Sequence, residues 1–270
     1  MGAKLTSRIL FQPPEVASYS QIYPREVEYF RTKSNIRVPF YFVESDTPSQ
    51  VYVLYAHGNA TDMGHSYEFI CNLSQKLSVN VMHFEYYGYG ILKNNSKPSE
   101  EGVYETILGA YTYLTETLRI DPRTIILMGT SMGTGAVIYL ASTLAVNNVD
   151  VGGLILESPF ESVVRCLSRN WFGRYIDMFP SRFRIKNVRC PILILHGTRD
   201  KVVPIKHGKE MLKLARCKVS PHWVDGAGHN NLRRKMGINK YNEVLKKFII
   251  ELYRDVNSPS LHSNNPLQVY

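Results

Sequence analysis

The stretch TIILMGTSMG, residues 124–133, joins a strand-like run to a serine flanked by glycines. Residues 124–128 form an apolar run that predicts a buried strand, and apolar side chains recur at helical spacing from residue 132 to residue 144. Between them lies Gly-x-Ser-x-Gly, the pattern of a nucleophile elbow, with the serine at position 131. A turn this tight leaves no room for side chains at the flanking positions. The stretch therefore predicts a strand, a sharp turn that presents the Ser131 hydroxyl, and a helix.

Similar runs alternate along the rest of the chain. Strands are predicted at residues 26–33, 37–44, 51–56, 79–84, 124–128, 151–156, 191–195 and 219–224, the first two as a hairpin through Ser34-Asn35. Helical spacing is found at residues 62–77, 132–144 and 241–253, and in a helix capped by Ser99 whose buried stripe runs from Val103 to Leu118. Alternation of this kind predicts the α/β class, with a mostly parallel eight-stranded sheet covered by helices on both faces.

The composition suits one large α/β domain, since the chain has 270 residues, 44% of them apolar and 20% charged. The pattern predicts an arm at residues 1–24, the folded domain at residues 25–254 and a flexible tail at residues 255–270. Four cysteines without repeated spacing give no metal pattern and no disulfide framework, so a reducing compartment is expected. No run is long or apolar enough to predict a membrane span or a signal peptide.

The net charge of +9 is compatible with binding to nucleic acid or to a membrane surface, and also with a role in solubility alone. No nucleic-acid-binding motif accompanies the charge, so nucleic acid is not an expected partner. The first eight residues, MGAKLTSR, match the N-myristoylation pattern, in which Gly2 follows the initiating Met and a Ser or Thr stands four residues later. Two interpretations stay open here, a lipidated Gly2 and an unmodified, disordered start.

A serine nucleophile needs a base and an acid that orients the base, and after an elbow they follow in the order Asp or Glu, then His. LILHGTRD ends a late strand with a glycine turn and Asp200, and WVDGAGH follows the last strand with His229. Each has a plainer interpretation, a helix N-cap for Asp200 and a surface loop residue for His229. Their joint occurrence at strand ends, in this order, predicts a catalytic triad of Ser131, Asp200 and His229.

One carboxylate competes with Asp200 for the role of the acid. Glu157 directly follows its own predicted strand, and the carboxyl ends of parallel strands meet at the edge of the sheet where ligands bind. Ser158 and Pro159 come next, which leaves the chain little freedom to bring Glu157 to the histidine. Glu157 is therefore expected near the pocket but outside the triad.

The oxyanion of an acyl-transfer intermediate needs two N–H donors. One is expected from Met132, which follows the nucleophile at the start of a helix. The other is expected from HGNA, residues 57–60, with the Asn59 N–H favoured and Ala60 as the second choice. His57 is expected to hold this loop rather than to act as a base. These roles require no metal and no organic cofactor.

Taken together, these motifs resemble the α/β-hydrolase superfamily over residues 25–253. Within it, the chain resembles the membrane-associated serine hydrolases that remove palmitate from cytosolic proteins, and their Bem46-like relatives. The matching stretches are HGNATDMG (57–64), YGYG (87–90), PSE (98–100), GTSMG (129–133), HGTRD (196–200) and GAGHN (226–230). The resemblance implies a cofactor-free acyl-protein thioesterase that acts on S-palmitoylated proteins, in the cytoplasm and at the cytosolic face of membranes. The alternatives are a monoacylglycerol or other carboxylic-ester lipase of the same fold and, less consistent with an intact triad, a non-catalytic binding protein.

The chain departs from those depalmitoylases near its N-terminus, where they carry a palmitoylated cysteine cluster and this chain has no cysteine before Cys71. One myristoyl chain at Gly2 binds membranes only marginally, so a basic surface would have to add to it. The expected lid, residues 158–190, interleaves seven basic residues with aromatic ones. The basic residues are Arg165, Arg169, Arg174, Arg182, Arg184, Lys186 and Arg189, and the aromatic ones include Trp171, Phe172, Tyr175, Phe179 and Phe183. Either the lid is a solvated segment whose aromatics pack on the core, or it is a cap that rests on a membrane and admits an acyl chain.

Overall fold

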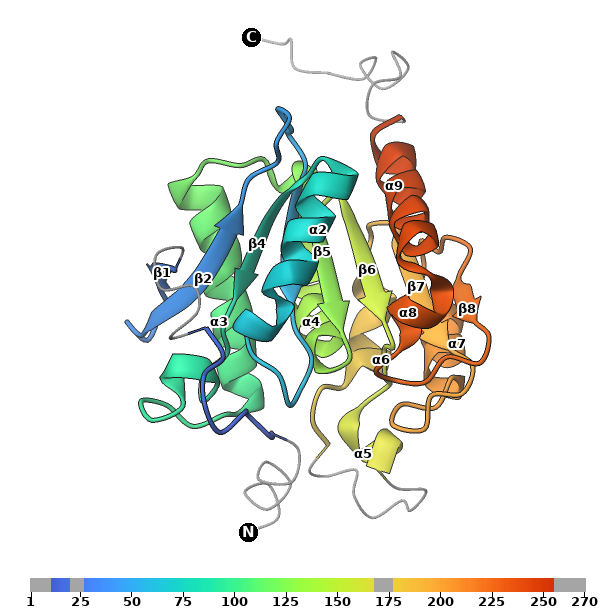
Figure 1. Cartoon of the computed structure of the whole chain (residues 1–270), viewed down its shortest axis with the longest axis horizontal. Helices are drawn as coiled ribbons and strands as arrows, with labels where there is room; N and C mark the ends of the chain where they lie inside the picture. The colour runs from blue at the N-terminus through green and yellow to red at the C-terminus, as the bar shows by residue number, and fades with distance from the viewer. Residues whose placement is uncertain (1–10, 20–26, 168–176, 255–270) are drawn as a thin grey trace, which may run out of the picture.

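The computed structural model describes residues 11–19, 27–167 and 177–254. Within these residues eight strands form one sheet in the order β1-β2-β4-β3-β5-β6-β7-β8 (Figure 1). The strands are β1 Glu28–Arg31, β2 Arg37–Val43, β3 Tyr52–Ala56, β4 Asn80–Phe84, β5 Ile125–Thr130, β6 Gly153–Glu157, β7 Ile192–Gly197 and β8 His222–Val224. β2 pairs antiparallel with β1 and with β4, and every other neighbouring pair is parallel. The predicted α/β class, its eight mostly parallel strands and the first hairpin are confirmed.

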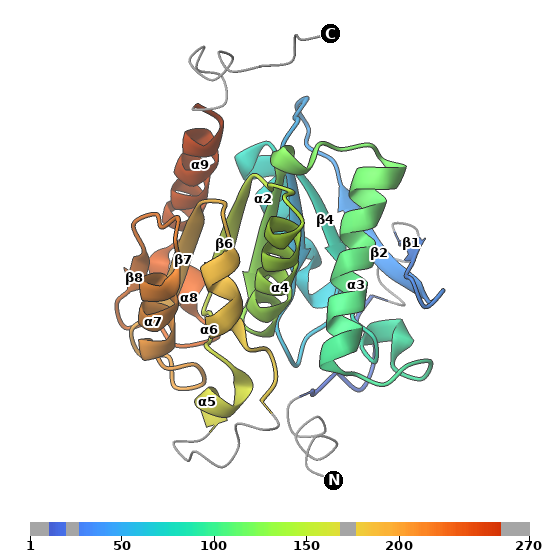
Figure 2. The same ribbon diagram turned by 180° about the vertical axis from the view of Figure 1, so that it is seen from behind.

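Helices cover both faces of this sheet. They are α2 Tyr67–Leu77, α3 Glu100–Thr112, α4 Met132–Val146, α5 Val163–Leu167, α6 Ser181–Arg184, α7 Lys206–Leu214, α8 Leu232–Met236 and α9 Ile238–Arg254. Figure 1 shows α2, α8 and α9 in front of the sheet, and Figure 2 shows α3, α4, α6 and α7 on the opposite face. One apolar core lies under each layer, which is why central strands such as β5 are buried along nearly their whole length.

The structure departs most clearly from the sequence predictions at three places. α2 begins at Tyr67 rather than at residue 62, because the Asp62 carboxylate accepts backbone N–H groups and a 3₁₀ turn comes before the helix. β8 has three residues where six were predicted, since Pro221 has no N–H for the ladder. Leu118, predicted to be buried, is 41% exposed because α3 passes into a π-helical turn at Tyr113–Thr117, which shifts the helical phase.

The chain's two ends were predicted to be an arm and a tail around the domain. Residues 11–19 of the arm lie against the domain, with Phe11 and Tyr19 buried. Gly2 and the predicted tail at residues 255–270 fall outside the described residues, so the division into arm, domain and tail stays a prediction. Among the helices that the structure describes, none has both the length and the apolar character that crossing a membrane requires.

Candidate active site

Ser131 lies on the turn between β5 and α4, as the elbow pattern predicts. Its backbone angles, φ 51° and ψ −117°, are rarely adopted by residues that carry a side chain. A Cβ added at Gly129 would come within 2.4 Å of the Gly133 carbonyl oxygen, and one added at Gly133 within 2.1 Å of the Ala56 carbonyl oxygen. The two glycines are thus required by close backbone packing, and the strand–turn–helix geometry of the elbow is confirmed.

The structure brings the three predicted triad residues together at the carboxyl ends of β5, β7 and β8. The Ser131 Oγ lies 2.9 Å from the His229 Nε2, and the His229 Nδ1 lies 2.7 Å from the Asp200 Oδ2. The Asp200 side chain is fully buried, whereas His229 keeps 13% of its side chain exposed. The three side chains therefore form one continuous hydrogen-bonded chain from a buried carboxylate to an accessible hydroxyl.

Backbone donors hold the Asp200 carboxylate in place. Its Oδ1 accepts the N–H groups of Val202 at 2.9 Å and Val203 at 2.8 Å, while its Oδ2 accepts from His229. Burial alone would raise the pKa of the Asp200 carboxyl, but the hydrogen bond and charge of His229 and the backbone N–H hold it below its ordinary value of 3.8. Oδ1 thus orders the loop that follows β7, and because α7 begins only at Lys206 with Ile205 as its N-cap, the plainer interpretation of Asp200 as a helix N-cap is wrong. Oδ2 makes the contact that the triad prediction requires.

The rival acid Glu157 makes different contacts. Its Oε2 accepts from the Arg233 Nε and from the Tyr241 hydroxyl, each at 3.0 Å. The Arg233 guanidinium also stacks over the Phe69 ring, 3.4 Å from its centroid, and donates to the Thr130 Oγ1 at 3.1 Å. Glu157 is therefore half of a largely buried ion pair beside the pocket. Sequence reasoning missed Arg233, whose partners are far from it along the chain.

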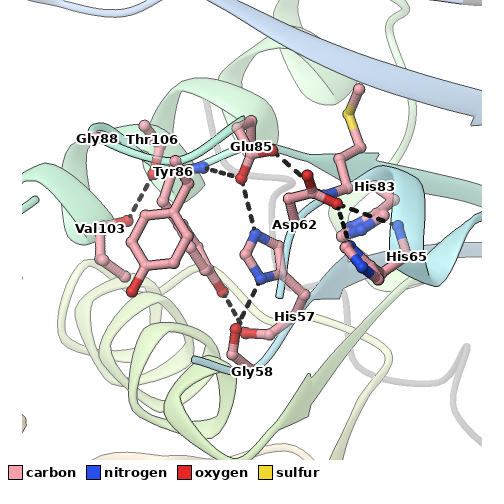
Figure 3. A network of polar contacts seen from close by, with 12 residues as sticks. His57, Gly58, Asp62, His65, His83, Glu85, Tyr86, Gly88, Val103 and Thr106 are labelled. Carbon is pink, nitrogen blue, oxygen red and sulfur yellow. Dashed lines mark hydrogen bonds and ion pairs between the residues drawn. The ribbon is translucent and has the colours of Figure 1, made fainter. Parts of the chain in front are cut away.

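The oxyanion loop, residues 57–64, is held by His57 as predicted. The ring Nδ1 donates to the Gly58 carbonyl at 2.7 Å, and Nε2 lies 3.0 Å from the Glu85 Oε1; the His57 and Glu85 side chains are both fully buried (Figure 3). Because N–H and C=O point in opposite directions across a trans peptide, the inward Gly58 carbonyl turns the Asn59 N–H away from His57. Asn59 lines the same cavity as Ser131. This orientation is compatible with the predicted role of the Asn59 N–H as a donor at the cavity.

Two buried carboxylates secure the rest of the loop. Glu85 accepts the Tyr86 N–H at 3.1 Å and the Met63 N–H at 3.2 Å, in addition to His57. Asp62 accepts the His65 N–H at 3.1 Å and its ring Nδ1 at 2.7 Å (Figure 3). These bonds fix the shape of a loop that has no regular secondary structure at its start.

The second predicted donor, Met132, is the first residue of α4, where a backbone N–H has no acceptor within the helix. Met132, Asn59 and the alternative donor Ala60 all line the cavity that contains Ser131. The structure therefore brings the predicted donors to one place, and their role in catalysis stays a prediction.

A cavity of about 870 Å³ opens at the Ser131 hydroxyl. Its lining divides into two kinds. The apolar wall comes from the lid and from the loop before α7, namely Phe160, Val163, Phe179 and Val203. The polar wall comes from the ends of β3, β5 and β6 and from α8, namely Tyr55, Thr130, Glu157 and Arg233. Apolar side chains of the lid and polar side chains from the strand ends therefore both line the cavity that contains Ser131.

In the described part of the lid, four of the five basic residues pair with acidic side chains within the chain, and the fifth, Lys186, is exposed. Arg165 pairs with Glu161, Arg182 with Glu161 and Glu210, Arg184 with Glu100, and Arg189 with Asp150. Phe179 is fully buried, whereas Phe183 is 59% exposed. These contacts favour the packing interpretation for this part of the lid. Arg169, Trp171, Phe172, Arg174 and Tyr175 fall outside the described residues.

Comparisons with known proteins agree with the fold. Residues 49–256 match the family model described as an alpha/beta hydrolase domain. The chain is 35% identical over 225 residues to Alpha/beta hydrolase domain-containing protein 17C of Mus musculus, covering 83% of this chain and 67% of that protein. Identity to the Homo sapiens protein of that name is also 35%, with 65% of its length covered, so the chain spans about two thirds of these relatives. The solved alpha-beta hydrolase of Vibrio vulnificus has the same fold, with a TM-score of 0.68, 21% identity and coverage of 91% of this chain and 93% of that one. The chain belongs to the α/β-hydrolase family.

Proposed function

We propose that the protein is a serine hydrolase in which Ser131 is the nucleophile, His229 the general base and Asp200 the acid that orients it. The observation that carries the proposal is the continuous hydrogen-bonded chain from Asp200 through His229 to Ser131 at the cavity. A histidine whose Nδ1–H donates to a buried carboxylate leaves Nε2 free of a proton, which is the form that accepts the serine proton.

The mechanism follows from these positions. His229 Nε2 takes the Ser131 proton as Oγ attacks the carbonyl carbon, and the N–H groups of Asn59 and Met132 donate to the oxyanion that forms. His229 then gives the proton to the leaving thiol or alcohol, which leaves an acyl-enzyme on Ser131. Water, deprotonated by the same histidine, attacks the acyl carbonyl; the acid is released and the proton returns to Ser131.

For the substrate we infer an S-acylated cysteine with a long acyl chain, such as palmitate. The apolar wall of the cavity suits an acyl chain, with burial of each methylene contributing about 0.8 kcal/mol, and the polar wall suits a peptide leaving group. The motifs that resemble the depalmitoylase group support the same substrate class. Peripheral contact with a membrane, through Gly2 myristoylation together with a basic surface, belongs to the same proposal.

A substrate panel tests this function on the wild type and Ser131→Ala together. We expect the wild type to release palmitate from a palmitoyl-cysteine peptide and to be labelled by a fluorophosphonate probe, and Ser131→Ala to do neither. Ser142→Ala, a substitution at a buried hydroxyl in the interior of α4, is the matched control and is expected to keep both activities. Rapid hydrolysis of a monoacylglycerol without any thioesterase activity would replace this proposal by the lipase. Labelling of Ser131→Ala would remove Ser131 as the nucleophile.

A further inference from the structure

Residues 11–19, here called the N-terminal strap, run along the edge of the sheet that carries the candidate active site (Figure 1). At one end the strap is held by Phe11, which is 4% exposed and meets the ring of Phe179 edge-on at 6.3 Å. At the other end Tyr19 is 1% exposed, and its hydroxyl accepts the Ile91 N–H at 3.1 Å. The strap is therefore docked by buried aromatic side chains at both of its ends.

Hydrogen bonds join the strap to the oxyanion loop at two points. The Gln12 N–H donates to the Asn59 Oδ1 at 3.0 Å, so the first bond reaches a residue that lines the cavity and is the predicted oxyanion donor. The Ser18 N–H donates to the Asp62 Oδ2 at 2.7 Å, and the Ser18 hydroxyl donates to the other oxygen of the same buried carboxylate. The strap thus holds the loop segment from residue 59 to residue 62 at both ends.

The segment between these two bonds is strained. Ala60 has φ 55°, in the left-handed region that disfavours residues with a Cβ, and such conformations persist only where the surroundings impose them. The strap is part of those surroundings, because it lies directly against the loop at Gly64: a Cβ there would lie 2.4 Å from the Ser18 side-chain Oγ and 2.8 Å from the Tyr19 backbone N.

We propose that the N-terminal strap is a positioning element of the active site, which holds the oxyanion loop in the shape that aims the Asn59 N–H at the reacting carbonyl oxygen. The inference rests on the proposed function, since it presupposes an acyl-enzyme on Ser131. Without the strap, the backbone at Ala60 leaves the left-handed conformation, and the Asn59 N–H no longer points at the reacting carbonyl oxygen. Displacing a catalytic group by about 1 Å costs on the order of 10²-fold in rate.

Three variants of the full chain test the strap. Gln12→Pro removes the N–H that bonds Asn59, and Gln12→Ala is its matched control, because it removes a side chain of the cavity lining but keeps that N–H. Gly64→Ala pushes the strap away from the loop without removing any hydrogen-bonding group of either. The measurements are kcat and KM on a short-chain ester and the midpoint of thermal unfolding. Each kcat is divided by the number of active sites, which is counted by labelling the protein to completion with fluorophosphonate.

We expect Gln12→Pro and Gly64→Ala to lower kcat about 10- to 100-fold with KM changed less than about threefold, and Gln12→Ala to lower kcat at least about fivefold less than Gln12→Pro does. Val16→Ala, at a strap residue that is 71% exposed, should leave both kcat and KM within about twofold of the wild type. A purely structural strap would lower the number of labelled sites and the unfolding midpoint but leave kcat per site unchanged, which would overturn the proposal. An equal loss in Gln12→Ala and Gln12→Pro would overturn the role of the Gln12 N–H. A wild type that neither labels nor hydrolyses would instead refute the proposed function.

Discussion

Replacing Asp200 by asparagine tests the proposed triad at the atom that selects the histidine tautomer. The asparagine side chain has one oxygen and one NH₂ group to place where Asp200 has two acceptors. One position faces the N–H groups of Val202 and Val203 at 2.9 and 2.8 Å, and the other faces the His229 Nδ1 at 2.7 Å. Since only an oxygen can accept two backbone donors, the NH₂ group has to face His229.

The structure also gives the size of the effect. Turning the NH₂ group toward the two backbone donors would leave both unsatisfied in a buried site, at roughly 1–3 kcal/mol each, or about 2–6 kcal/mol together. With the NH₂ group facing His229, Nδ1 becomes an acceptor and the ring proton moves to Nε2, which then cannot take the Ser131 proton. Restoring the productive tautomer costs that same energy, so we expect kcat to fall roughly 10²- to 10⁴-fold at an almost unchanged KM.

The assay is steady-state hydrolysis of the preferred ester or thioester by Asp200→Asn, with Asp225→Asn as the matched control. Asp225 lies on an exposed loop between β8 and His229, where it accepts from the Thr198 hydroxyl at 3.0 Å, so its loss should change kcat less than about twofold. The tautomer argument is refuted if Asp200→Asn keeps more than a tenth of the wild-type kcat. If Glu157→Gln abolishes activity in the same assay, the acid is Glu157.

Two further predictions concern stability. Arg233→Met leaves the buried Glu157 carboxylate without its guanidinium and should lower the free energy of unfolding by about 3–5 kcal/mol. The double variant Arg233→Met with Glu157→Leu should recover most of that free energy. Urea denaturation measures both variants, and equal losses in the two would contradict this account. Burial and, next, the charge of Lys206 lower the pKa of His207 from 6.5 to about 4, so the unfolded state binds more protons between these pH values. Stability should therefore fall as the pH drops from about 6.5 to 4. Urea denaturation at several pH values in this range gives the free energy of unfolding as a function of pH. This dependence should be weaker in His207→Gln than in the wild type, and an equal dependence in the two proteins would contradict the role of His207.

The sheet and the candidate triad were predictable from the sequence because their signals are local. Each triad residue follows an apolar strand-like run, and glycines accompany each of the three turns. Parallel strands end at one edge, so three separate local patterns imply one shared site. The same reasoning found the His57 loop, because a short motif directly after a strand specifies its position at that edge.

The remaining parts of the site depend on contacts between distant segments and leave no local pattern. The Gln12–Asn59 bond joins residues 47 apart in the sequence, and the Arg233–Thr130 bond joins residues 103 apart. In the sequence, nothing distinguishes Arg233 from the basic residues that follow it, Arg234 and Lys235. Leu118 shows a related failure, because an ideal helical period does not anticipate a π-helical turn.

The backbone of Ser131 has a bearing on how such a chain changes over evolutionary time. A side chain held at φ 51° and ψ −117° costs roughly 1–3 kcal/mol, a sizeable share of the 5–15 kcal/mol that keeps an ordinary domain folded. Glycine would occupy the same position without that penalty. A lineage that no longer used the hydroxyl would gain stability from a single substitution at this site. The serine at position 131 is thus a residue that drift alone would tend to remove.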